Sequence, residues 1–226
     1  MSAEEISALL LSLRVGVAAV TMSLPFAIAI AYVLARWQFH GRLLLQGIVD
    51  LPLVLPPVVT GYLLLMLFAP NGPVGQWLDM IGVRIAFTWF GAAIASAVVS
   101  FPLMVRAIRG AMQSVDRRFE LAARSLGKSR WSAFWLITLP LSRHGIVAGC
   151  LLAFARSVGE FGATILLAGD IPDETRTIPL AIYSMGQRVD GFQQSWRLVL
   201  LSVCLSVTAL VIGELFEKRR GQHVPG

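Results

Sequence analysis

Long apolar stretches limit what this chain can fold into more than any other feature of its sequence. Several windows exceed about 18 predominantly apolar residues, the length that an α-helix needs to cross a hydrocarbon layer about 30 Å thick. Only 14% of the residues are charged, against about 25% in soluble domains, which leaves no room for a soluble domain of ordinary size. The sequence therefore predicts an all-α integral membrane protein with a single transmembrane domain over residues 1–226.

Five membrane spans are expected, and the distribution of charge orients them. The spans cover about residues 9–35, 43–69, 86–108, 133–167 (interrupted) and 196–216. Lys and Arg gather in three clusters at alternate ends of these spans: Arg36 with Arg42, residues 106–130, and residues 218–220. Because basic loops stay in the cytoplasm, this alternation predicts an outside N-terminus, an inside C-terminus and a cytoplasmic loop at 109–131, between spans three and four. The acidic start of the chain lacks the basic region of a cleaved signal peptide, so the first span is expected to be retained.

A run of prolines in the second span predicts a kinked or locally unwound helix. The stretch reads Leu51-Pro-Leu-Val-Leu-Pro-Pro-Val-Val-Thr-Gly61, and each proline removes a backbone donor and crowds the preceding turn. Lipid cannot satisfy the freed carbonyls, so neighbouring helices or a water-lined cavity must do so. Two interpretations stay open, a packing kink and the wall of a transport pathway. For the second, the candidate residues are Asp50, Pro56, Pro57 and Thr60.

Two charged residues lie close together near the outer end of the fourth span. Arg156 and Glu160 are four residues apart, so they can pair on one helix face. A lone charge at the bilayer centre would cost about 2.5–3.5 kcal/mol on insertion scales, so either a structural ion pair or a role in the pathway or its gate would explain them. Gly159 and Gly162 predict a bend or break. Thr164, just beyond it, is a further candidate for the pathway or its gate.

The basic loop between the third and fourth spans predicts a short amphipathic helix. Asp116 is placed to cap its start, and Gly127 suits the left-handed position after its end. One apolar stripe is formed at helical spacing by Phe119, Ala122, Ala123 and Leu126. It is ringed by the cations Arg117, Arg118, Arg124, Lys128 and Arg130. A shallow stripe of this kind favours docking into a protein groove, and a membrane-surface helix that binds lipid headgroups is the alternative.

The sequence gives no support for an enzyme, a metal site or a bound cofactor. The three histidines are scattered without a second ligand at metal spacing. Gly127-Lys128-Ser129 resembles the end of a phosphate-binding loop, but position 122, where the first glycine belongs, is alanine. An acid/base pair of Asp50 and Glu160 is the weakest hypothesis, since the expected topology places them near opposite faces of the bilayer. The net charge of +6 is explained by the topology clusters, so no nucleic-acid binding is expected.

One motif resembles a known family. Glu120-x-Ala-Ala-x-x-x-Gly127, followed by Ile137-x-Leu-Pro140, is similar to the EAA loop of permease subunits of bacterial ABC importers. In the commonest form of that loop the acidic residue directly precedes the two alanines, whereas Leu121 holds that place here. The resemblance implies a coupling helix that docks into a groove of a partner ATPase, which hydrolyses the ATP. The coupling residues it implies are Glu120, Ala122, Ala123, Gly127, Ile137 and Pro140.

Three further stretches, residues 50–61, 159–164 and 173–179, resemble permeases of molybdate importers. This resemblance implies a homodimer in the bacterial inner (plasma) membrane, with two copies of the ATPase. It also implies that an oxyanion-binding protein, periplasmic or extracellular, delivers molybdate to outer loops that include residues 70–84 and 170–194. Sulfate, thiosulfate or tungstate are alternative cargoes. A membrane scaffold with a lipid-binding basic helix is the alternative of a different class.

Overall fold

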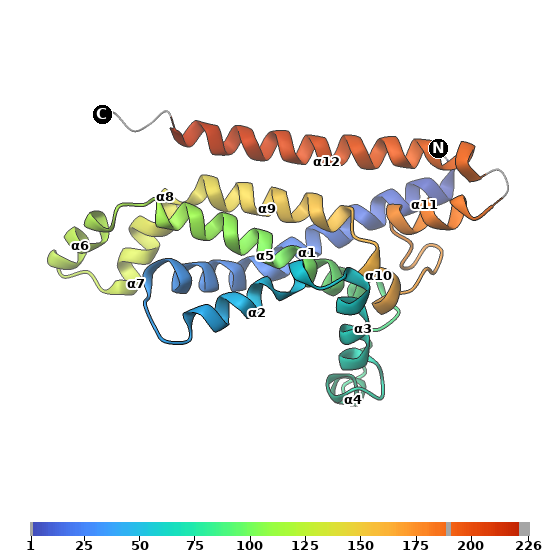
Figure 1. Ribbon diagram of the computed structural model, residues 1–226, viewed down its shortest axis with the longest axis horizontal. Helices are drawn as coiled ribbons and strands as arrows, with labels where there is room; N and C mark the ends of the chain where they lie inside the picture. The colour runs from blue at the N-terminus through green and yellow to red at the C-terminus, as the bar shows by residue number, and fades with distance from the viewer. Residues whose placement is uncertain (1, 189–190, 222–226) are drawn as a thin grey trace.

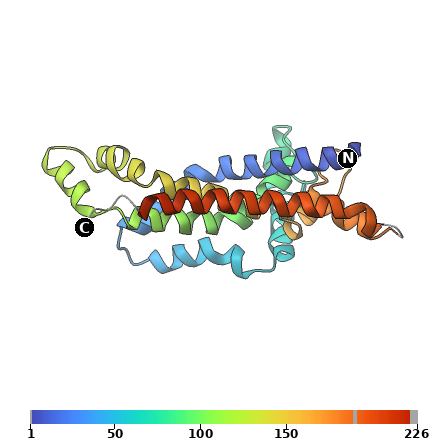
Figure 2. The ribbon, with the colours of Figure 1, turned by 90° about the horizontal axis from the view of Figure 1, so that it is seen from above.

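The computed structural model describes residues 2–188 and 191–221, which form helices and turns without a strand. The all-helical fold expected from the sequence is thus confirmed for this part of the chain. Four helices run along the length of the molecule (Figure 1): α1 (Ala3–Arg36), α5 (Trp89–Gln113), α9 (Arg143–Val158) and α12 (Gly191–Gly221). The N-terminus lies at one end, and the basic loop that holds α6 (Arg117–Ser125) lies at the opposite end (Figures 1 and 2).

Three helices in the described residues are long and apolar enough to cross a membrane. These are α1, α5 and the part of α12 between Ser195 and Gly213. Two bent pairs pass the same criterion when each is taken as one span: α2 (Arg42–Val54) with α3 (Pro57–Phe68), and Arg130–Leu141 with α9. By length and composition the chain therefore has three membrane-spanning helices, or up to five, and the five spans expected from the sequence are the upper figure.

Small residues allow α1 and α5 to pack closely in the core. In α1 the buried side chains facing the bundle include Ala19, Ala27 and Ala31, and in α5 they include Ala92 and Ala95, each fully buried. Between membrane helices the apolar surroundings give no hydrophobic driving force, so close van der Waals contact of this kind holds them together. The pattern explains why the longest helix, α1, fits beside α5 (Figure 2).

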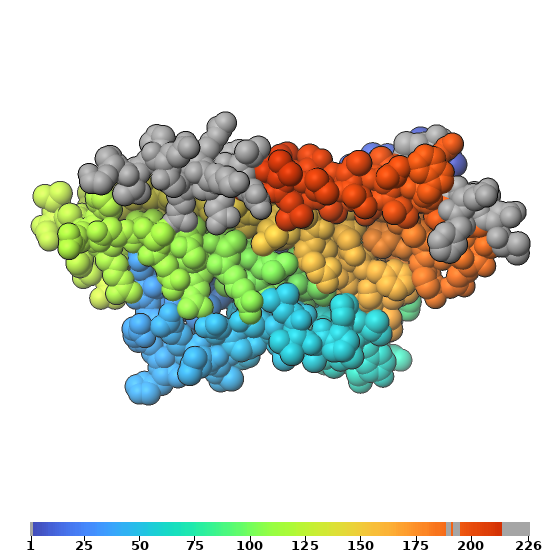
Figure 3. Space-filling view, turned by 45° about the horizontal axis from the view of Figure 1, so that its top comes forward, coloured from blue at the N-terminus to red at the C-terminus, as the bar shows by residue number. Residues whose placement is uncertain are grey.

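The proline run bends the second apolar segment, as the sequence predicted. Helix α2 ends at Val54, α3 begins at Pro57, and the two axes differ by 111°. Pro57 occupies the first turn of α3, where backbone N–H groups have no partner within the helix, so its missing N–H costs no hydrogen bond. Helix α3 therefore leaves the direction of the bundle and packs against α10 (Gly162–Leu167). The segments α2 and α3 form a ridge on one side of the molecule (Figure 3).

The segment expected as the fourth span, residues 133–167, is divided more than predicted. Helix α9 ends at Val158 and α10 begins at Gly162, so the predicted break at Gly159 and Gly162 is present. A second bend of 67°, at Ser142, was not predicted. It follows a π-helix, η1 (Phe134–Thr138), which leads into α8 (Leu139–Leu141). Pro140 explains this irregularity, because its ring crowds the carbonyl one turn earlier and it has no N–H to continue the α-helical bonds.

Short helices occupy the segments expected to be loops. They are α4 (Pro73–Met80), α7 (Arg130–Ala133) and α11 (Ile178–Gly186). Helix α11 packs against α1 and α12, with the Ser12 hydroxyl of α1 accepting a hydrogen bond from the Ile178 N–H at 2.7 Å. Part of the expected outer loop, residues 189–190 and the side chains of 192–194, lies outside the described residues, as do the basic side chains of 218–220.

Candidate coupling loop and transport pathway

Helix α6 is capped at both ends by the residues that the sequence predicted. The Asp116 carboxylate accepts a hydrogen bond from the Arg118 N–H at 2.9 Å and so caps the start. At the other end the N–H of Gly127 donates to the Arg124 carbonyl and that of Lys128 donates to the Ala123 carbonyl, at 3.0 and 3.1 Å. Gly127 has a φ of +81°. This pair of bonds around a left-handed residue is the Schellman arrangement, in which glycine avoids the strain of a side chain.

The apolar stripe predicted on α6 is uncovered in the single chain. No residue of α6 is buried, and Phe119 and Leu126 are 58% and 83% exposed. Ala122 is exposed between them and Ala123 is half-buried. Large apolar side chains that flank two alanines give a surface with a shallow centre, which is the shape expected of a helix that enters a groove of another protein.

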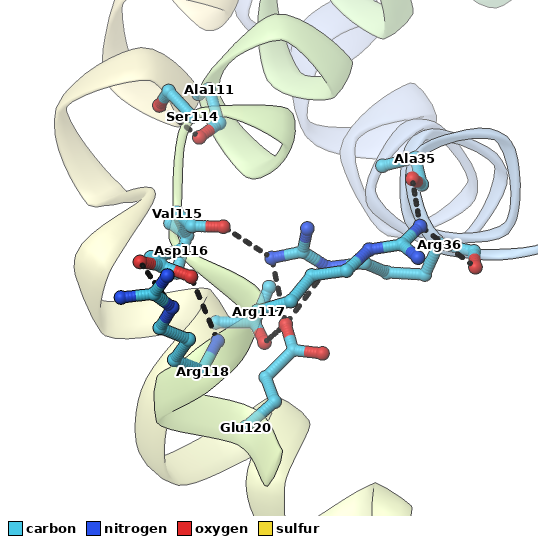
Figure 4. Close-up of polar contacts among 10 residues, drawn as sticks. Ala35, Arg36, Ala111, Ser114, Val115, Asp116, Arg117, Arg118 and Glu120 are labelled. Atoms are coloured by element: carbon cyan, nitrogen blue, oxygen red, sulfur yellow. Dashed lines mark hydrogen bonds and ion pairs between the residues drawn. The ribbon is translucent and has the colours of Figure 1, made fainter.

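Glu120 points toward Arg36, at the end of α1 (Figure 4). Its Oε1 lies 2.8 Å from both Nε and Nη2 of Arg36, at the end of α1, and accepts a hydrogen bond from the Thr138 hydroxyl at 2.6 Å. The Arg36 and Glu120 side chains are only 6% and 15% exposed. Arg36 also donates to the Val115 carbonyl at 3.0 Å. We call these three side chains, Arg36, Glu120 and Thr138, the Arg36–Glu120 bracket.

The bracket joins three parts of the chain that the sequence kept separate. It ties α6 to the last turn of α1 and to η1, and thereby brings the Ile137-x-Leu-Pro140 segment next to α6. Arg117 adds to the connection because its Nη2 donates to the carbonyls of Ala35 and Arg36, at 3.5 and 3.3 Å (Figure 4). Cations are favourable at a helix C-terminus, where carbonyls lack partners. Sequence reasoning read Arg36 only as a topology signal, and Thr138 carried no signal at all.

Breaking the bracket is expected to destabilise the chain by about 1–3 kcal/mol, because the remaining charge is left with poor solvation. Arg36→Gln and Glu120→Gln should each lower the thermal unfolding midpoint by several degrees. The double variant should lose less than the sum of the two, by about 1 kcal/mol or more. The matched control is Arg84→Gln, which opens the exposed Arg84–Asp79 pair and should change stability by less than about 0.5 kcal/mol. Strictly additive losses would show that the two groups do not interact.

Helices α3 and α10 bring several pathway candidates together. The Glu160 side chain is 2% exposed, and its Oε2 lies 2.7 Å from Nη1 of Arg156. Its Oε1 accepts a hydrogen bond from the Ala163 N–H at 2.8 Å, so that Glu160 also caps α10. The backbone of Ala163 touches α3: a Cβ added at Gly61 would lie 2.7 Å from the Cα and the carbonyl oxygen of Ala163. Pro57 packs against Gly162 in the same contact.

The candidate hydroxyls differ in whether they are already occupied. Thr164 is buried and donates to the carbonyls of Glu160 and Phe161 within its own turn, at 3.1 and 2.9 Å. The hydroxyls of Thr60 and Ser96 are buried without a hydrogen-bond partner among the described residues. A buried polar group is ordinarily satisfied by protein or water. Thr60 therefore has a hydroxyl that is free to bind a further group, whereas the Thr164 hydroxyl is already bonded.

Asp50 has its own partner on α5. The Asp50 carboxylate pairs with Arg106 of α5, with Nε to Oδ1 and Nη2 to Oδ2 both 3.0 Å. Arg109 donates to the Gln46 amide oxygen at 3.0 Å and adds a second link between α2 and α5. Pro56 is exposed at the bend. Asp50 and Glu160 are thus held by different arginines.

Much of the apolar surface of the single chain is uncovered. Exposed large side chains lie along α2, α3 and α12, and include Leu43, Leu44, Val54, Tyr62, Met66, Val203 and Val207. A soluble monomer rarely exposes a contiguous apolar area of this kind, so these faces need lipid or another protein.

Among the described residues, no group of three or more His, Cys, Asp or Glu side chains is placed to hold a metal ion.

Comparisons with known proteins agree with these features. Residues 23–222 match the family model described as "Binding-protein-dependent transport system inner membrane component". The molybdenum transport system permease protein ModB of Haemophilus influenzae is 50% identical over 95% of this chain and 94% of its own length. The sulfate transport system permease protein CysT of Escherichia coli (strain K12) is 36% identical over 89% and 72%. The same fold is seen in a solved structure of a bacterial alginate ABC transporter in complex with alginate pentasaccharide-bound periplasmic protein. The TM-score is 0.74, with 20% identity, and the match covers 98% of this chain and 81% of that one.

Proposed function

Because this chain belongs to the family of binding-protein-dependent transport system inner membrane components, we propose that it is the permease subunit of an ATP-driven importer of molybdate. The observation that carries the proposal is the uncovered, doubly capped helix α6 within a loop of the EAA type. The 50% identity to a molybdenum permease, against 36% to a sulfate permease, favours molybdate as the cargo. In this proposal the chain is a non-catalytic subunit, and two copies of a partner ATPase hydrolyse the ATP.

The proposed topology has five spans, with the N-terminus outside and the C-terminus inside a bacterial inner membrane. The two bent pairs, α2 with α3 and Arg130–Leu141 with α9, each count as one span in this arrangement. It is supported by the concentration of Arg and Lys around α6, at the end of the molecule opposite the acidic residues Glu4 and Glu5. Helix α6 then lies in the cytoplasm, where a soluble ATPase can reach it.

We assign two roles to the coupling residues. Phe119, Ala122, Ala123 and Leu126 form the face that enters the ATPase groove, which is consistent with their exposure. Glu120 has a positioning role within this chain, because its carboxylate holds α6 to α1 and η1. Ile137 and Pro140 follow on η1 and α8 and connect that loop to α9. Movement of the ATPase would then reach the membrane helices through the Arg36–Glu120 bracket as well as along the chain.

The proposed pathway lies between two copies of the chain, along α3 and the junction of α9 with α10. The ridge of α2 and α3 carries the exposed apolar side chains that a second copy would cover. Thr60 offers a buried hydroxyl that has no partner in the described part of the chain, and Arg156 offers a cation already neutralised by Glu160. A tetrahedral dianion in transit needs donors without a tight cationic clamp, and this combination supplies them. The outer segments that contain α4 and α11 are the proposed contacts for the oxyanion-binding protein.

Uptake of labelled molybdate into proteoliposomes tests the function directly. The vesicles contain this chain, its ATPase and its binding protein, and we expect uptake that requires ATP and survives a large excess of unlabelled sulfate. Unlabelled tungstate is a second competitor, which reports how far the system separates the two dianions. Uptake abolished by sulfate would keep the importer and change the cargo. An intact complex that transports no oxyanion would contradict the importer and favour the scaffold alternative.

A further inference from the structure

We propose that the pocket behind α6 binds the phosphate of an anionic phospholipid of the inner leaflet. The pocket has a volume of about 260 Å³ and lies between the last turn of α1, helix α6 and helix α7. Its lining contains the guanidinium groups of Arg36, Arg117, Arg124 and Arg130, and Glu120 is its one carboxylate. Four positive charges and one negative charge leave the lining with a net charge of +3. From the proposed function the inference takes only that this pocket lies on the cytoplasmic side of the membrane.

Two of the four arginines are available to a ligand. The charge of Arg36 is matched by Glu120 in the Arg36–Glu120 bracket, and Arg117 donates to carbonyls at the end of α1. Arg124 and Arg130 have neither an ion pair nor a side-chain hydrogen bond with any described residue, and both are exposed. Like charges around one pocket repel each other, so an anion bound between them removes an unfavourable interaction. Guanidinium groups are also suited to phosphate, because they can donate two parallel hydrogen bonds.

The surroundings of the pocket favour a lipid phosphate over a free anion. Trp37 and Tyr32 belong to the lining, and Trp37 is exposed where α1 changes from apolar to cationic residues. Beside the pocket, Trp131, Trp135 and Leu136 are all exposed on α7 and η1. Amphipathic aromatic rings concentrate at the level of the headgroups, and basic pockets between membrane helices on the cytoplasmic side bind acidic headgroups. A diacyl lipid would use both the cationic pocket and the apolar rim, whereas a free anion would use only the first.

The test uses the assembled transporter, this chain with its ATPase, purified in detergent. Native mass spectrometry measures retained phosphatidylglycerol against phosphatidylcholine of the same chain length. We expect preferential binding of phosphatidylglycerol, weakened about fivefold for each arginine replaced in Arg124→Gln and Arg130→Gln. Arg118→Gln is the matched control, because Arg118 lies on the same helix outside the pocket and is 92% exposed. The affinity of the Arg118→Gln variant for phosphatidylglycerol should equal that of the unmodified protein.

Several results would overturn the inference. Equal lipid binding by the pocket variants and the unmodified protein would show that the pocket takes no phospholipid. Displacement of phosphatidylglycerol from the unmodified protein by millimolar inorganic phosphate or molybdate would assign the pocket to a free oxyanion. Loss of the ATPase with lipid binding unchanged would assign both arginines to protein docking. Because lipid binding is measured without transport, a failed uptake experiment would contradict the proposed function and leave this inference standing.

Discussion

Glu160→Gln is expected to reduce molybdate uptake about tenfold or more, while the permease still assembles with its ATPase. Glutamine keeps the size of the side chain and an oxygen that can accept from the Ala163 N–H, but it removes the charge that faces Arg156 at 2.7 Å. A charge-assisted hydrogen bond contributes about 1.5–3 kcal/mol, and about 1.4 kcal/mol corresponds to a factor of ten. Arg156 would then face the pathway as an unpaired cation, which would hold a dianion instead of passing it on.

The measurement is ATP-dependent uptake, with complex assembly followed separately by size-exclusion chromatography. A double variant, Arg156→Gln with Glu160→Gln, removes both charges and should recover part of the lost uptake. Thr164→Val is a useful companion, because the Thr164 hydroxyl is already bonded within its own turn and its loss should change uptake only slightly. Normal uptake by Glu160→Gln would restrict Glu160 to a structural role.

Gly127→Val is expected to uncouple the ATPase from the permease, with ATP-driven uptake reduced at least about tenfold. Gly127 has a φ of +81°, which costs a β-branched residue roughly 1–3 kcal/mol of strain. Among the described residues, no atom lies within 4 Å of the position that a Cβ would take, so within this chain the effect comes from the backbone. If the Schellman turn opens, the last turn of α6 and Leu126 lose their fixed place on the docking face. Gly127→Asp should act in the same direction, through its added charge.

Two controls separate backbone strain from added bulk. Asparagine tolerates the left-handed region better than valine, so Gly127→Asn should retain most of the uptake. Gly110→Ala adds a methyl group in α5 at another position with open space, but in ordinary helical backbone, and should behave as the unmodified protein. Co-purification of the ATPase and its hydrolysis rate are measured with each variant. If Gly127→Val binds and stimulates the ATPase normally, α6 is not the docking helix.

Local features of the coupling loop could be read from the sequence, because short-range rules determine them. Asp116 caps α6 and Gly127 ends it through bonds that span at most five residues, and the apolar stripe follows from helical periodicity alone. The bend at Pro56 and Pro57 and the break before Gly162 have the same local origin. These elements need no knowledge of the rest of the fold. Residue type and spacing were sufficient for them.

Contacts between distant segments could not be read in this way. Arg36 and Glu120 are separated by 84 positions, and nothing in either neighbourhood identifies the other as its partner. The sequence assigned Glu120 to the coupling loop but could not tell that its side chain faces inward. The bend at Ser142 was missed because Pro140 acts through a π-helix, and α11 was missed because its packing on α1 and α12, rather than a strong amphipathic pattern, stabilises it. The orientation of Glu120, the bend at Ser142 and the position of α11 all depend on tertiary packing.

The contact between Gly61 and Ala163 has a mechanical consequence. Close-packed backbones leave no slack for sliding, and here α3 lies against α10 so tightly that even a methyl group at Gly61 would collide with backbone atoms. We therefore expect the two helices to move together as one rigid unit, although more than 90 residues of chain separate them. The hinges of this unit are the irregular turns at Pro56, between α2 and α3, and at Gly159, between α9 and α10. In the proposed pathway, this pair of helices would pivot at two points, and neither helix would need to unwind.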